Sequence, residues 1–198
     1  MCSFPVPGET IEKKPFFAQC LYEYILEEKC SLLSVEKSVF YSQPSNMSKL
    51  PIAEYLKRNV LVLDGGQGTE MERRGLDVMH PLWSTLPFMK KNPAHLKRIQ
   101  EMYHDFSGSG ARALATITYK ASFVNLKQYS DGEVATQQQY EQFLNDVIGF
   151  TCEKCVSDDQ YLIGSVGPYG ACLCNGAEYT GDYGSEKIDF KQYFKPQL

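Results

Sequence analysis

An aspartate followed by a glycine-rich turn is the feature of this sequence most suggestive of chemistry. Asp64 directly follows the apolar run 60–63 and is itself followed by Gly65 and Gly66. A carboxylate at the end of a buried strand is costly unless a cation pairs with it, so we expect a cationic partner from the protein or a ligand. The glycines either let a ligand approach the backbone or supply the unusual angles of a tight turn. The stretch lacks the spacing of dinucleotide and P-loop motifs, which argues against a nucleotide site.

A second polar group falls at the end of the next predicted strand. Thr116, Thr118 and Lys120 alternate along residues 116–122, so their side chains share one face. They are candidates for ligand binding. Ordinary β-propensity of threonine, with a lysine whose stem lies along apolar surface, explains the same pattern equally well.

A third candidate is the loop 164–171, rich in Gly and containing Ser165, Gly167 and Tyr169. Such a loop allows a ligand to approach the backbone, or it is a plain turn.

The cysteines offer a superficial metal motif. Cys152 and Cys155 form a Cys-x2-Cys pair, and sixteen residues separate them from Cys172 and Cys174. Four thiolates would suit zinc. However, the first pair lies near the end of a predicted helix and the second follows a strand, which places the pairs at opposite ends of the sheet. We therefore expect no structural zinc at these residues.

The elements that position these residues alternate between strand and helix. Asn92 and Pro93 predict a helix start, and Gly108 and Gly110 predict its end. Alternating strands and helices imply a parallel sheet, either open and doubly wound or closed as a barrel, with its site at the carboxyl ends of the strands. The predicted strands are 60–63, 113–119 and 161–166, and the predicted helices are 92–108, 132–156 and a third that begins near residue 186.

The remaining sequence and the composition indicate the broad class. Residues 1–46 differ in character and are expected to form an appendage, whereas 47–198 form the domain. A net charge of -4 gives no basis for nucleic-acid binding. No apolar run approaches the roughly 18 residues of a membrane span, and no signal peptide is evident. Seven irregularly spaced cysteines suit a reducing compartment. We expect a cytoplasmic protein with small-molecule ligands, no nucleic-acid partner and no membrane partner.

Five ordered blocks resemble the homocysteine S-methyltransferases that use S-methylmethionine or S-adenosylmethionine. The resemblance covers about residues 50–198, and the blocks that carry it are LVLDGGQGTEMERRG, PLWS, GARALATITYKASF, YLIGSVGPYGA and EYTGDYG. The resemblance implies an α/β fold, with the first three βα units of a TIM-type (βα) barrel. It also implies a zinc-bound homocysteine thiolate that attacks the methyl group of a sulfonium donor.

The resemblance also suggests roles for individual residues. Asp64 would receive the amino group of the substrate, and Trp83 would lie on the donor side, where an indole face can hold a sulfonium cation. Trp83 could instead pack a satellite core. The expected substrate-binding residues are Asp64, Gly65, Gly66, Trp83, Thr118, Tyr119, Ser165 and Gly167.

Two departures from the family pattern limit the expected activity. Lys120 stands where the family usually has an uncharged residue, and its charge would repel a sulfonium donor unless the side chain turns away. The family's zinc ligands, a late cysteine and an adjacent Cys-Cys pair, are absent from this sequence. Three strands cannot close an eight-stranded barrel. We therefore expect a partial barrel that is inactive by itself. Two alternatives stay open: a non-catalytic binding or assembly module that self-associates through its open sheet edge, and a redox or zinc module built on the cysteines.

Overall fold

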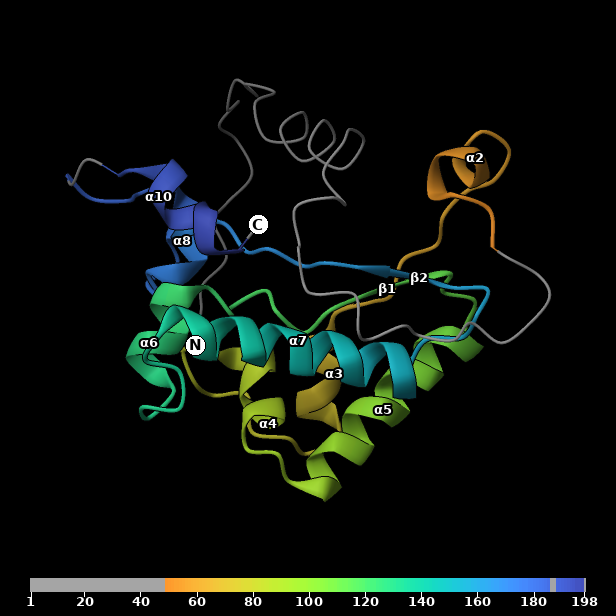
Figure 1. Cartoon of the computed structure of the whole chain (residues 1–198), viewed down its shortest axis with the longest axis horizontal. Helices are drawn as coiled ribbons and strands as arrows, with labels where there is room; N and C mark the ends of the chain where they lie inside the picture. The colour runs from red at the N-terminus through yellow and green to blue at the C-terminus, as the bar shows by residue number, and fades with distance from the viewer. Residues whose placement is uncertain (1–48, 186–187, 198) are drawn as a thin grey trace, which may run out of the picture. The chain divides into compact units, whose positions relative to one another are not determined.

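The protein is an α/β structure with a small parallel sheet (Figure 1). The computed structural model describes residues 49–185 and 188–197. The predicted appendage, residues 1–46, lies outside the described residues. The helices are α2 (Ile52–Leu56), α3 (Gln67–Arg73), α4 (Leu86–Met89), α5 (Pro93–Gly108), α6 (Phe123–Tyr129), α7 (Gln137–Lys154), α8 (Tyr169–Cys172), α9 (Ala177–Thr180) and α10 (Phe190–Phe194), with 3-10 turns η1 (Trp83–Thr85) and η2 (Lys195–Gln197).

The sheet consists of β1 (Ala113–Ala115) and β2 (Tyr161–Ile163), which pair in parallel with Ala113 opposite Tyr161. The two predicted strands therefore exist, and each is shorter than expected. The ladder ends where Thr116 donates its N–H to the carbonyl of Ile163 at 2.9 Å. Beyond that point side-chain hydrogen bonds join the two segments, so the backbone no longer forms regular strand.

The predicted strand at residues 60–63 differs most from expectation. It contributes one parallel bridge, Leu63 to Ala113, and three of its four side chains are exposed, whereas that of Leu61 is half-buried. Val60 is 83% exposed, Val62 48% and Leu63 59%. The physical reason is that the described helices pack on the core cluster, which includes none of Val60, Val62 and Leu63, so the faces of this segment stay uncovered by the described elements. Among the described residues, no segment pairs with its other edge.

The two long helices match the sequence prediction closely. Asn92 caps α5 by accepting a hydrogen bond from the N–H of Ala94 at 2.9 Å. Helix α7 begins at Gln137, later than the predicted residue 132, because Thr136 and Gln139 form a capping box there. The predicted apolar face of α7 is buried, with Tyr140, Phe143, Val147 and Thr151 all inside.

The core lies between the strands and the helices on one side of them. Figure 1 shows α3, α4, α5 and α7 together on that side. Buried residues from each of these elements form one cluster that also includes Leu114 of β1. This cluster fixes the strand ends relative to the loop 65–91, which carries α3, η1 and α4. Among the described helices, none is long and apolar enough to cross a membrane.

Candidate functional site

Asp64 stands where the first extended segment meets the turn into α3. Its Oδ2 accepts hydrogen bonds from Nε2 of Gln67 at 2.8 Å and from the backbone N–H of Ala115 at 3.0 Å. Burial raises the pKa of the Asp64 carboxyl above its usual value, and these two hydrogen bonds offset the effect only in part. Within the described ranges, no cationic side chain pairs with Asp64. Its partners are neutral, so the cation expected from the sequence is not supplied by this part of the protein.

Gln67, which the sequence analysis did not select, braces Asp64. Its Nε2 also donates to the carbonyl oxygen of Ala115 at 2.6 Å, and Tyr103 Oη donates to the same oxygen at 2.7 Å. The amide thus links the turn to the end of β1 and orients the carboxylate. A polar residue in a glycine-rich turn gives no periodic signal, and its partner on β1 is 48 residues away in sequence.

The structural need for glycine differs between the positions of this turn. A Cβ on Gly65 would lie 2.8 Å from Cε1 of Phe106, and one on Gly66 would meet only Thr69 at ordinary contact distance. Gly68 is the most constrained, because a Cβ there would lie 2.1 Å from Cζ2 of Trp83. Gly65 thus allows the turn before α3 to approach Phe106, and Gly68 allows α3 itself to pack on Trp83. Close packing within the protein therefore accounts for both.

Trp83 lies against α3 with an unusual backbone. Its φ is 45°, in the left-handed region that bulky side chains rarely adopt. The indole packs on Gly68 and meets the Tyr119 ring edge-on, with centroids 6.2 Å apart. Trp83 and Tyr119, two of the expected binding residues, are therefore neighbours. Burial raises the pKa of Tyr119, and the nearby Glu178 carboxylate adds to the shift.

These two rings line an open hollow of about 600 Å³. Its walls come from the loop before η1, the end of β1 and the α8–α9 region. Charged and aromatic groups share the lining, including His80, Trp83, Tyr119, Lys120, Glu178 and Tyr179. We call this space the Trp83 hollow. It combines aromatic faces with one positive and one negative side chain.

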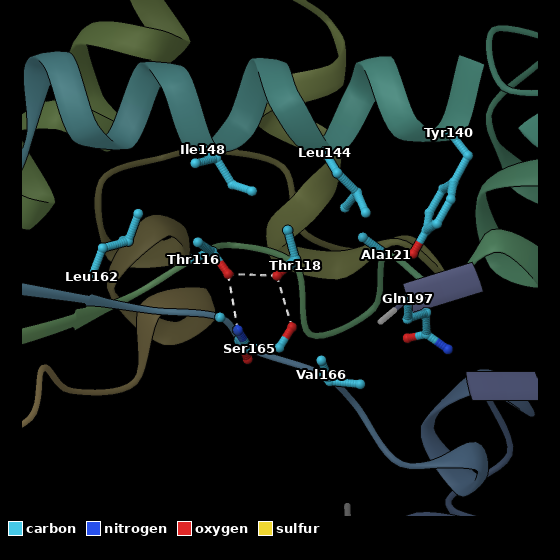
Figure 2. A pocket seen from close by; sticks show the side chains of 11 residues that line it. Thr116, Thr118, Ala121, Tyr140, Leu144, Ile148, Leu162, Ser165, Val166 and Gln197 are labelled. Atoms are coloured by element: carbon cyan, nitrogen blue, oxygen red, sulfur yellow. Dashed lines mark hydrogen bonds between the residues drawn. The ribbon is translucent and has the colours of Figure 1, made fainter. Parts of the chain in front are cut away.

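Thr118 and Ser165 lie in a different cavity, of about 210 Å³ (Figure 2). Thr118 Oγ1 donates to the carbonyl of Ser165 at 2.7 Å and lies 2.6 Å from Thr116 Oγ1. The N–H of Ser165 donates to Thr116 Oγ1 at 2.9 Å. Figure 2 shows these three residues below α7, whose Leu144 and Ile148 point toward them. Their polar groups thus join the two strand ends to each other.

Gly167 allows the backbone of the loop after β2 to lie close to the backbone of Tyr119. A Cβ at this position would lie 2.0 Å from the carbonyl oxygen of Tyr119. The loop after β2 therefore packs directly on the end of β1. This contact explains Gly167 without a ligand and brings the α8–α9 region beside Lys120.

Lys120 turns toward α8 and α9. Its Nζ donates to the carbonyl oxygen of Ala171 at 2.7 Å and to Oε1 of Glu178 at 3.1 Å. Both side chains of the ion pair are 11% exposed. Its charge is therefore balanced by Glu178, a partner that the sequence analysis missed because 58 residues separate the two.

The described cysteines do not form a metal site. Cys152 and Cys155 lie at the end of α7, before β2, whereas Cys172 and Cys174 follow β2 at its other end. Burial raises the pKa of Cys155 to about 12. In residues 49–185 and 188–197, no group of three or more His, Cys, Asp or Glu side chains is placed to hold a metal ion.

The expected binding residues thus fall into three neighbourhoods. Asp64, Gly65 and Gly66 share the turn before α3, Trp83 and Tyr119 share the Trp83 hollow, and Thr118 and Ser165 share the smaller cavity, while Gly167 contacts the backbone of Tyr119. Helix α3 connects the first two, since Asp64 precedes it and Trp83 packs on it.

Comparison with known proteins identifies related sequences and structures. The family model described as homocysteine S-methyltransferase matches residues 61–198. Homocysteine S-methyltransferase 2 of Saccharomyces cerevisiae is 44% identical over 163 residues, which cover 77% of this chain and 49% of the relative. A selenocysteine methyltransferase of Astragalus bisulcatus is 31% identical over 157 residues, which cover 70% of this chain and 45% of that protein.

A solved structure has a similar fold. The oxidized form of the homocysteine methyltransferase MmuM from Escherichia coli superposes with a TM-score of 0.58 at 27% identity, covering 75% of this chain and 51% of that chain. The chain spans about half the length of the curated relatives it matches.

Proposed function

Because the chain belongs to the homocysteine S-methyltransferase family, we propose that it forms the amino-acid-binding part of a cytoplasmic methyltransferase with a TIM-type (βα) barrel. The described residues correspond to its first three βα units. The reaction of the whole barrel moves a methyl group from a sulfonium donor, S-methylmethionine or S-adenosylmethionine, to homocysteine and gives methionine. The substrates are small molecules.

The proposal rests on the contacts of the Asp64 carboxylate, which has hydrogen-bond donors but no cationic partner among the described residues. The carboxylate is held by two neutral donors at the end of the first extended segment, and no described cation balances it. An ammonium group of an amino acid supplies the missing charge. A hydrogen bond to a charged group contributes about 1.5 to 3 kcal/mol. Asp64 therefore anchors the substrate, and Gln67 and Ala115 hold the carboxylate in place for it.

The transfer requires a thiolate. The homocysteine thiol loses its proton to solvent, the sulfur attacks the methyl carbon, one C–S bond forms, and the C–S bond of the donor breaks to leave a neutral thioether. Zinc, which the sequence resemblance implies, would deprotonate the thiol on coordination. The residues present do not fit zinc: the sequence has no adjacent Cys-Cys pair, which the resemblance implies for the metal, and the described residues contain no group of three candidate ligands. We therefore propose that this chain alone binds amino acid and does not transfer methyl groups.

One purified sample tests both halves of this proposal. The full 198-residue chain is titrated with homocysteine in a calorimeter, and methionine formation from homocysteine and S-methylmethionine is followed by mass spectrometry. We expect saturable homocysteine binding and no methionine above the protein-free reaction. A folded chain that binds no homocysteine would overturn the proposed function, and turnover by the chain alone would overturn its proposed inactivity.

The exposed segment 60–63 favours a second candidate, a non-catalytic module that associates through its sheet edge. Val60, Val62 and Leu63 present apolar side chains next to a backbone edge without a described partner. Such edges pair readily with other chains. Analytical ultracentrifugation measures this directly. A concentration-dependent dimer that Val62→Lys abolishes would support association, and a monomer at all concentrations would exclude it.

A further inference from the structure

Asn175 is the only asparagine in the sequence that a glycine follows. The backbone nitrogen of the next residue can attack an asparagine side chain and close a five-membered succinimide ring. Glycine favours this reaction, because it has no side chain to obstruct the approach and its backbone adopts many conformations. The pair Asn175 and Gly176 is therefore a candidate for spontaneous deamidation, provided that the fold leaves the reacting groups accessible.

The fold does leave both groups accessible. Asn175 is exposed, and Gly176 is partly buried with φ 84°. A Cβ on Gly176 would meet no described atom within 4 Å, so no neighbouring group blocks the approach. Among the described residues, none accepts a hydrogen bond from the N–H of Gly176. The attacking nitrogen and water can thus both reach the side-chain amide.

One contact prepares the amide for attack. Oδ1 of Asn175 accepts a hydrogen bond from the N–H of Ala177 at 3.0 Å. This bond draws electron density away from the amide carbon Cγ and keeps the amide turned toward the backbone that follows it. The contact that precedes α9 therefore favours closure of the ring.

We propose that Asn175 is a site of spontaneous deamidation that alters α9. The N–H of Gly176 loses its proton to solvent, and the nitrogen bonds to Cγ of Asn175 while the amide nitrogen leaves Cγ as ammonia. Water then opens the ring at either of its two carbonyl carbons. Opening at Cγ gives aspartate, and opening at the main-chain carbonyl gives isoaspartate, whose backbone contains one additional carbon. The net reaction consumes water, releases ammonia and needs no oxidant.

The two products differ in their effect on α9. Aspartate keeps the backbone unchanged and retains an oxygen that accepts from Ala177. Isoaspartate lengthens the chain directly before α9, where the backbone is closely packed. Ala177 is 1% exposed, and a Cβ on Gly170 would lie 2.7 Å from the backbone nitrogen of Glu178. The backbones of α8 and α9 are thus in close contact, so the additional carbon displaces α9.

Displacement of α9 reaches the Trp83 hollow through one ion pair. Glu178 of α9 pairs with Lys120 at 3.1 Å, and both side chains are 11% exposed. Tyr179, the next residue of α9, also lines the hollow. Isoaspartate at position 175 therefore separates the ion pair and changes one wall of the hollow, whereas aspartate leaves both as they are.

Incubation of the full chain in heavy-oxygen water detects the reaction. Each deamidation incorporates one heavy oxygen, and peptide mass spectrometry after digestion in ordinary water assigns the residue. The matched control in the same molecule is Asn145, which is exposed but lies inside α7 and precedes Asp146. We expect label to appear at position 175 at least tenfold faster than at position 145, with isoaspartate as one product.

Equal rates at the two positions of the folded chain would overturn the proposal. Rapid labelling of Asn175 in the urea-unfolded chain alone would do the same, since it would show that the contact with Ala177 protects the amide. Because the comparison is made within the parent chain, it requires no variant that has to fold.

Hydrogen exchange tests the consequence for α9. Chromatography separates the isoaspartate form of the aged chain, and the variant Asn175→Asp supplies the aspartate form directly. The N–H groups of Thr180 and Gly181 are hydrogen-bonded across α9, and we expect them to exchange at least tenfold faster in the isoaspartate form than in the variant. Equal exchange would show that α9 tolerates the additional carbon and would overturn the proposed effect. Neither measurement involves a ligand, so the result does not depend on the proposed function.

Discussion

Replacing Gly68 with alanine tests the contact between α3 and Trp83. The new Cβ would lie 2.1 Å from Cζ2 and 2.2 Å from Cε2 of the indole, whereas carbon atoms in contact are about 3.5 to 4.0 Å apart. The ring must therefore move by roughly 1.5 Å, in a residue whose backbone already has φ 45°. Overpacking of this kind costs about 1 to 3 kcal/mol, which lowers the melting temperature by roughly 2 to 12 °C for a protein of this size.

Trp83 is the only tryptophan, so its emission reports the displacement directly. Thermal unfolding is followed by intrinsic fluorescence for Gly68→Ala and for the control Gly149→Ala. Gly149 lies inside α7 with nothing near its would-be Cβ, and alanine there should stabilise by about 0.5 to 1 kcal/mol. Equal melting temperatures for the two variants, with an unchanged native emission spectrum, would refute the close packing of Gly68 on Trp83.

Three further predictions concern other groups. Burial raises the folded-state pKa of Asp64 above 3.8, so the contribution of this group to stability is fully present below pH 3.8 and is lost as the pH rises through the raised pKa. The variant Asp64→Asn should therefore gain stability relative to the parent across that pH window. Urea unfolding at several pH values measures this difference. Thr116→Val should destabilise by about 1 to 3 kcal/mol, because it leaves the N–H of Ser165 without its acceptor; an unchanged urea midpoint would contradict this. Iodoacetamide at pH 8 should label exposed Cys174 well before Cys155, which is buried and has a pKa raised to about 12; faster labelling of Cys155, seen by peptide mass spectrometry, would show that this part of the core opens.

The sequence predicted the long helices well because their signals are local. Asn92 and Pro93 mark the start of α5, and the spacing of apolar residues marks the buried face of α7. The strands were overestimated because β-branched residues continue past the point where the backbone ladder ends. Thr116 and Thr118 belong to the β-rich pattern but hydrogen-bond through their side chains.

Only some of the contacts around the candidate site could be expected from the sequence, because the side chains that form the others are distant along the chain. The position of Asp64 at the end of an apolar extended segment is a local feature that the sequence shows directly. The hydrogen bond from Gln67 to Ala115 joins residues 48 positions apart. The ion pair between Lys120 and Glu178 joins residues 58 positions apart. Pairings of this length are set by how the strand ends meet in space, and no periodicity in the sequence encodes them.

The affinity of Asp64→Asn for homocysteine tests the central claim most directly. Asparagine keeps the shape and can accept the same hydrogen bonds from Gln67 and Ala115, so the fold is retained and only the charge is removed. Losing a charged hydrogen bond of about 1.5 to 3 kcal/mol should raise the dissociation constant roughly ten- to a hundredfold. Asp158→Asn, at an exposed position, is the matched control. If calorimetry gives Asp64→Asn the same homocysteine affinity as the parent, Asp64 is a structural turn residue and does not anchor the amino acid.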